Sequence, residues 1–177
     1  MAKVVEDRPD WLGAPGVWDI YSVSGCVSRC FADYHDEWKH NGFGLFDSVD
    51  IIEQVARKKA IDLGDAKFFY YEVYEWQFDE DGNEGPVPVP DSPVTDVKMP
   101  EEKTLEGFDV VTFYAGSDPE CSPLSCNGLA REHEVNRHCL LASLEEAIAH
   151  LKNGVFKDSE PGPYRIFAVY SVRAGAS

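Results

Sequence analysis

The sequence predicts an α+β fold made of two β-α-β units that share one sheet. Residues 30–74 can be laid over residues 126–170 without a gap. In both stretches a strand pattern comes first, a helix pattern follows, and a second strand pattern ends the unit. Two such units favour a ferredoxin-like arrangement, with both helices on one face of a mainly antiparallel sheet. We expect one domain over residues 1–177, with an internal pseudo-repeat over 17–78 and 108–173.

The first unit opens with residues 17–23, whose β-branched and aromatic side chains predict a strand. Ser48 is a preferred residue type before a helix, and apolar residues then recur at helical spacing as far as Ala60. Gly64 can end this helix. Residues 68–78 predict the next strand. Aromatic residues fall on both faces of its first half, which predicts a central strand covered on both sides.

The second unit repeats this order. Residues 108–114 predict a strand, and Ser143 with Glu146 forms a capping-box pattern at the start of a helix. An apolar stripe continues through that helix to Leu151. Residues 164–172 then predict the last strand.

An acidic, proline-rich excursion over residues 79–106 joins the two units. From Glu75 to Glu106 the chain holds ten acids, two lysines and five prolines, so half of the net charge of −16 lies there. A field of this sign disfavours nucleic acids and anionic membranes. Two explanations remain: solubility alone, or a basic partner such as a nucleic-acid-binding protein or a cationic toxin.

Length and cysteine content bound the class of protein. A chain of 177 residues can bury a core without metals or disulfides. No apolar run reaches the roughly 20 residues that a membrane span needs, and the first residues are too polar for a signal peptide. An odd number of cysteines argues against a complete disulfide framework. These features predict a cytoplasmic location.

Two cysteine pairs follow the first strand of each predicted unit. They are Cys26 with Cys30, and Cys121 with Cys126. Pseudo-twofold symmetry could bring the pairs together, and four thiolates would make a structural zinc site, with His35 or His133 as possible substitutes. The alternative is that these cysteines only pack in the core.

Cys126 is also a candidate nucleophile. It precedes a possible short helix, and a histidine such as His138 could act as its base. No thiol-enzyme signature accompanies it, so Cys126 could equally pack beneath a loop held by Ser125 and Asn127.

Asp19 and Asp109 each follow an aromatic residue at the start of a predicted strand. For both carboxylates we expect a structural role, in which they satisfy a neighbouring loop.

Several runs in the second half are similar to a group of bacterial proteins of unknown function. They are Gly107-Phe108-Asp109-Val110, Pro123-Leu124-Ser125-Cys126-Asn127-Gly128, Asn136, Leu140-Leu141, Glu146-Ala147 and the closing run from Glu160 to Tyr170. The resemblance covers roughly the last 65 residues. It implies a small bacterial cytosolic protein and carries no activity.

Three functions remain open on the sequence. The first is an acidic binding or inhibitory protein, comparable to an immunity protein, that acts on a basic protein partner. The second is a thiol- or zinc-dependent protein that uses the Cys26/Cys30 and Cys121/Cys126 loops. The third is a structural or regulatory homodimer that associates through an exposed sheet face or edge. Whether the protein is an enzyme is left open, with the first reading preferred.

Overall fold

A computed structural model describes most of the chain. The described residues are 2–5, 7–24, 29–30, 45–88, 97, 99–114 and 119–173. Of residues 29–30 only the backbone is described.

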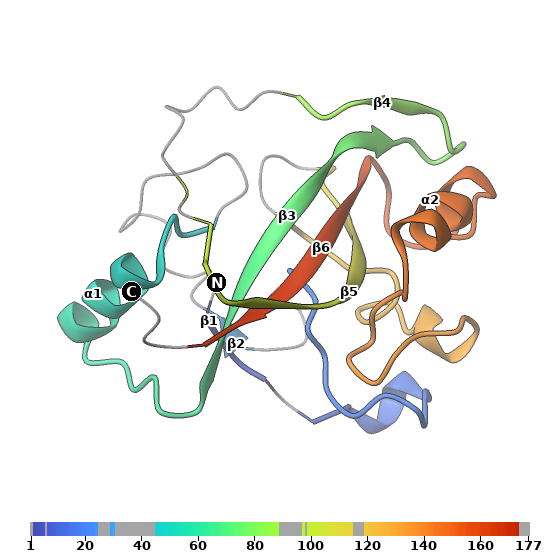
Figure 1. Ribbon diagram of the computed structural model, residues 1–177. Helices are drawn as coiled ribbons and strands as arrows, with labels where there is room; N and C mark the ends of the chain where they lie inside the picture. Colours follow the sequence, from blue (N-terminus) through green and yellow to red (C-terminus); the bar gives the residue numbers. More distant parts are fainter. Residues whose placement is uncertain are drawn as a thin grey trace.

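The described strands form one sheet around a long central pair (Figure 1). Their spatial order is β2-β1-β3-β6-β5, with β4 pairing with β3, and every pairing is antiparallel. The strands are β1 (Ala2–Val4), β2 (Arg29–Cys30), β3 (Ala66–Phe78), β4 (Glu84–Pro86), β5 (Lys103–Thr112) and β6 (Tyr164–Val172). The chain is therefore a mixed fold of helices and a mainly antiparallel sheet.

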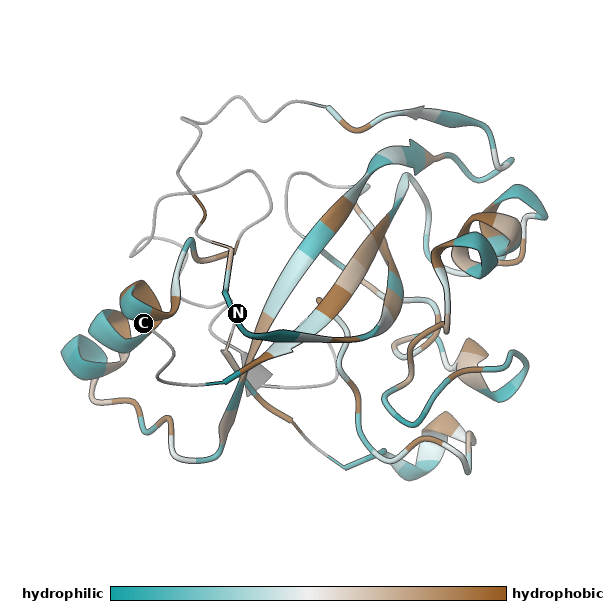
Figure 2. Cartoon of the chain, in the orientation of Figure 1, coloured by the Kyte–Doolittle hydropathy of each residue, from teal (hydrophilic) through white to brown (hydrophobic). Residues whose placement is uncertain are grey.

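β3 lies inside the sheet, between β1 and β6, and both of its faces are covered. Phe69 and Tyr71 pack on one face with Phe167 of β6. On the other face, Phe78 packs with Ile166. Apolar and polar residues accordingly mix along β3 and β6 in Figure 2. The predicted central, doubly covered strand is confirmed.

Both predicted helices form, and each begins at the predicted serine. α1 (Val49–Lys59) follows Ser48, whose Oγ accepts a hydrogen bond from the Ile51 N–H. α2 (Leu144–Lys152) follows Ser143, whose Oγ accepts from the Glu146 N–H. The two helices lie at opposite ends of the sheet in Figure 1. Two short 3-10 helices, η1 (Asp10–Leu12) and η3 (Leu129–Arg131), complete the described helical elements.

The predicted strand over residues 17–23 is wrong. Apart from one isolated bridge at Asp19, this segment pairs with no described strand. Its Trp18 and Tyr21 N–H groups instead donate to the carbonyl oxygens of Arg137 and His138. β-branched and aromatic residues are common in buried segments as well as in paired strands. The buried residues of this segment are Val17, Ile20, Tyr21 and Val23.

The ferredoxin-like arrangement is not confirmed. Without a strand over 17–23 the first unit lacks its opening strand, and β3 pairs directly with β6. The helices also pack in different clusters: Ile52 of α1 packs with Phe68, whereas Leu151 of α2 packs with Ile166. The internal pseudo-repeat stays a prediction.

The acidic excursion begins as a hairpin. Asp81-Gly82 lies in the turn between β3 and β4, with the Gly82 N–H donating to the Asp79 carbonyl oxygen. Residues 89–96 and 98 lie outside the described part of the chain.

Among the described residues, no helix is both long and apolar enough to cross a membrane.

Candidate functional site

A buried polar cluster holds residues 22–24 against the sheet. Asp109, on β5, is fully buried, and its Oδ2 accepts hydrogen bonds from Ser22 Oγ (2.6 Å) and the Val23 N–H (3.0 Å). Its Oδ1 accepts from Ser122 Oγ (2.7 Å). Lys3, on β1 and also buried, donates through Nζ to the carbonyl oxygens of Ser22 and Ser24. We call Lys3, Ser22, Ser24, Asp109 and Ser122 the Asp109 cluster.

Burial raises the pKa of Asp109, while hydrogen bonds from Ser22, Ser122 and Val23 and the nearby charge of Lys3 oppose that rise. The carboxyl group of Asp109 and the ammonium group of Lys3 both form hydrogen bonds with residues 22–24. The expected structural role of Asp109 is confirmed, because its hydrogen bonds satisfy the 22–24 loop.

The cysteines that are described border this cluster. Cys126 Sγ lies 3.6 Å from Ser24 Oγ and accepts the Ser122 N–H at 3.4 Å. Cys121 Sγ makes a long contact of 3.9 Å with Asn127 Oδ1. Cys139 is buried, and burial raises the pKa of its thiol well above the usual range.

The four-cysteine zinc site stays a prediction. Cys26 and the substitute ligand His35 lie outside the described residues, and only the backbone of Cys30 is described. Within the described part, no three His, Cys, Asp or Glu side chains form a group that could hold a metal ion.

His138 lies in a second polar cluster and does not contact Cys126. Its Nδ1 contacts Asp19 Oδ1, and Arg137 Nε donates to its Nε2 at 2.9 Å. Glu106 Oε2 lies 3.7 Å from the same Nε2. The ring stacks on Tyr21, with a centroid distance of 3.8 Å. Because Arg137 donates to Nε2, that nitrogen is already engaged, and no hydrogen bond joins the imidazole to Cys126 in the described structure.

His133 contacts a histidine of α2 that the sequence analysis did not single out. The rings of His133 and His150 lie 5.1 Å apart, edge to face. Burial lowers the pKa of His150, and the charge of His133 lowers it further. His150 Nδ1 is buried without a hydrogen-bond partner among the described residues. The pair thus joins the last turn of α2 to the segment that follows η3.

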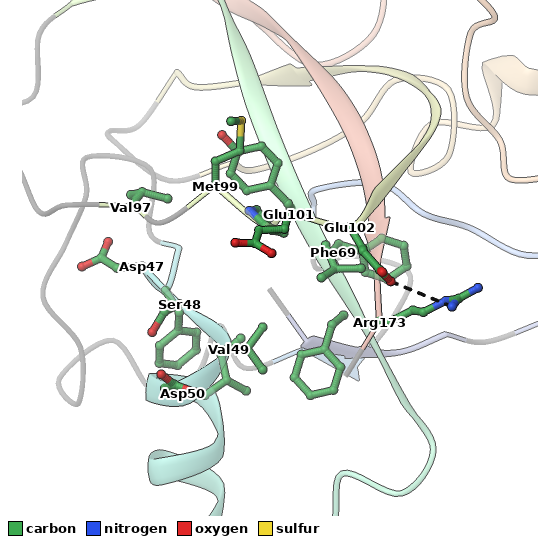
Figure 3. A pocket seen from close by; sticks show the side chains of 16 residues that line it. Asp47, Ser48, Val49, Asp50, Phe69, Val97, Met99, Glu101, Glu102 and Arg173 are labelled. Carbon is green, nitrogen blue, oxygen red and sulfur yellow. Dashed lines mark ion pairs between the residues drawn. The ribbon is translucent and has the colours of Figure 1, made fainter. Parts of the chain in front are cut away.

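A cavity of about 510 Å³ opens beside the first turn of α1. Its walls come from four separate parts of the chain: the start of α1, β3, the end of β6, and the residues before β5 (Figure 3). Ile52 and Phe68 give it an apolar floor. We call it the α1 cavity.

Carboxylates surround this apolar floor. Asp50 on α1 and Glu101 before β5 line the same hollow from different segments, and Glu101 lies over its centre in Figure 3. Glu102 also lines it and pairs with Arg173 at 3.9 Å. The α1 cavity could not be predicted from the sequence because the residues that line it lie far apart in the chain. The one local signal is the Met99-Pro100-Glu101-Glu102 run, which places an apolar side chain beside two acids.

Comparison of the chain with protein-family models, curated proteins and solved structures finds no match. The resemblance of the second half to a bacterial group therefore stays a prediction.

Proposed function

We propose that this chain is an acidic cytoplasmic binding protein that acts on a basic protein partner, in the manner of an immunity protein that neutralises a toxin. The observation that supports the proposal is the exposed row of carboxylates on the β3–β4 hairpin, formed by Glu75, Asp79, Glu80, Asp81 and Glu84. In Figure 2 this end of the sheet is predominantly hydrophilic.

Few positive charges offset this row. Glu84 pairs with Lys152 at 3.0 Å, and both side chains are about half exposed. Glu75 and Asp81 form no ion pair within the described residues. Exposed like charges repel one another, and a basic surface docked on them would relieve that repulsion and speed association. Solubility alone would not require the acids to be concentrated on one hairpin.

The test compares two charge-matched baits. In the hairpin variant, Glu75→Gln, Asp81→Asn and Glu84→Gln remove three carboxylates and leave Asp79, which holds the turn through Asn83. In the control variant, Glu132→Gln, Glu134→Gln and Glu145→Gln remove three exposed carboxylates elsewhere. Wild type and both variants are immobilised and exposed to lysate of the source organism, and retained proteins are eluted by salt.

We expect a basic protein whose affinity for wild type falls with salt, because screening weakens the attraction. Its affinity should fall about tenfold or more for the hairpin variant and less than threefold for the control, since only carboxylates close to the bound partner attract it strongly. Equal loss in both variants would reduce the effect to net charge, and a failure to retain any basic protein would reject the proposal.

A further inference from the structure

We infer that the α1 cavity binds the side chain of a lysine or an arginine: an alkyl stem against its apolar floor and a cationic head among its carboxylates. That a basic protein presents this side chain rests on the proposed function. The site itself rests on the cavity.

The size and floor of the cavity suit an elongated apolar group. About 510 Å³ lies within the usual range of small ligand sites. Phe68 and Ile52 are almost completely buried at its base. At the opening, Met99 keeps 65% and Val97 keeps 42% of its surface exposed, so apolar surface is available to a further group. Methionine adapts readily to a partner of unspecified shape.

The charges select a cation. Asp50 at the rim and Glu101 over the centre of the cavity have no ion pair within the described residues. The Glu102–Arg173 pair is long and its side chains are 67% and 87% exposed, so Arg173 offsets little of this charge. A helix N-terminus ordinarily attracts anions. Here Asp50 already occupies that position in the first turn of α1, so a second anion would be repelled.

The Tyr70 ring in the wall already holds a cation of the chain itself. The ammonium of Lys103 lies 4.7 Å from its ring centroid and is anchored on Glu72 at 3.4 Å. A further cationic head is therefore expected at the carboxylates of Asp50 and Glu101 and away from this ring. A long side chain with a buried stem and a cationic head matches the apolar floor and these carboxylates.

The probes are n-butylammonium and n-propylguanidinium, which reproduce the two side chains, with 1-butanol as the neutral control. Binding is followed by amide chemical shifts in two-dimensional NMR spectra of the full chain. We expect shifts at residues 48–52 and 99–102, with dissociation constants on the order of 1–10 mM for ligands of this size. 1-Butanol should bind at least fivefold more weakly.

Variants separate the cavity from general acidity. Asp50→Asn with Glu101→Gln should weaken binding of both cations at least fivefold, whereas Glu134→Gln with Glu145→Gln should leave it unchanged. The remaining amide shifts report whether each variant is folded. Equal binding of 1-butanol, or equal binding by both double variants, would overturn the inference.

A further arm uses spermidine, a free polyamine. If spermidine binds tenfold or more tightly than either probe, the cavity serves a small molecule and the inference of a protein side chain is wrong. The proposed function fails separately, through the hairpin variant. A partner that binds the Asp50/Glu101 variant as tightly as wild type would leave the proposed function intact and remove this site from it.

Discussion

At the scale of single residues, the Asp109 cluster shows how a segment without sheet pairing is fixed in place. Residues 22–24 receive hydrogen bonds from Lys3 on one side and donate to Asp109 on the other. Both ionisable side chains are buried, and removing a buried hydrogen-bond acceptor leaves each of its donors unsatisfied at a cost of roughly 1–3 kcal/mol. The cluster therefore acts as a clamp between β1 and β5.

Asp109→Ala should lower the free energy of unfolding at pH 7 by about 3–5 kcal/mol, because three buried donors lose their acceptor. The change leaves Ser22, Ser122 and the Val23 N–H without their acceptor and Lys3 without a neighbouring negative charge. Urea unfolding followed by tryptophan fluorescence measures the loss. A loss as small as that of Asp158→Asn, an exposed position, would contradict the clamp.

Asp109→Asn should reveal the raised pKa of this carboxyl. Burial places the folded-state pKa above the ordinary value of 3.8, so the folded protein takes up the proton more readily than the unfolded chain. The pH-dependent part of the stabilising contribution of Asp109 is then fully present below pH 3.8 and is lost as the pH rises through the folded-state pKa, while its hydrogen bonds to residues 22–24 and Ser122 remain. The stability of wild type relative to Asp109→Asn should thus be greatest in acid and decrease towards neutral pH. Urea titrations at several pH values test this, and a rise towards neutral pH would show that the sign is wrong.

The roles of these residues were only partly readable from the sequence. The position of Asp109 at the start of a strand-like run was enough to predict that it satisfies a loop. Its hydrogen-bond partners could not be predicted, because Ser22 lies 87 positions away and a single sequence does not show which distant residues meet in the fold. The same limit applies to His138, whose contact with Asp19 joins positions 119 apart.

At the scale of elements, local signals predicted the helices well. Each N-cap serine accepts an N–H three residues ahead, an interaction encoded within one turn. The strand expected over 17–23 was wrong because its apolar composition indicates burial in the core, while its backbone hydrogen bonds go to the loop at 137–138 and not to a neighbouring strand.

Ser143→Ala should lower the free energy of unfolding by about 1 kcal/mol, since the Glu146 N–H at the start of α2 loses its acceptor. Glu145→Gln, on the exposed face of the same turn, is the matched control and should cost less than about 0.5 kcal/mol. Urea unfolding of both variants against wild type decides between them. Equal effects would mean that the cap contributes nothing beyond the charge of the first turn.

At the scale of the whole molecule, the sequence predicted the fold class but not the topology. Helix and strand types depend on local periodicity, whereas the order β2-β1-β3-β6-β5 depends on which strands meet. The α1 cavity could not be predicted for the same reason, since Ile52 and Phe68 of its floor and Val172 of its wall lie far apart in the chain. The acidic balance is the whole-molecule property that composition did determine.

That balance predicts how the fold responds to salt. A net charge of −16 destabilises a compact chain through self-repulsion, which salt screens. Raising NaCl from about 20 to about 300 mM at pH 7 should therefore raise the Tm by about 3 °C, the equivalent of roughly 1 kcal/mol for a chain of this size. Near pH 4.5, where the sequence pI lies, the net charge is close to zero because some carboxylates are protonated and the basic side chains balance the rest, so the same salt step should have little effect. Calorimetry at both pH values makes the comparison. An equal rise in Tm at pH 4.5 would mean that salt acts by strengthening apolar burial. The exposed carboxylates would then not repel one another measurably, and a basic partner would have no such repulsion to relieve.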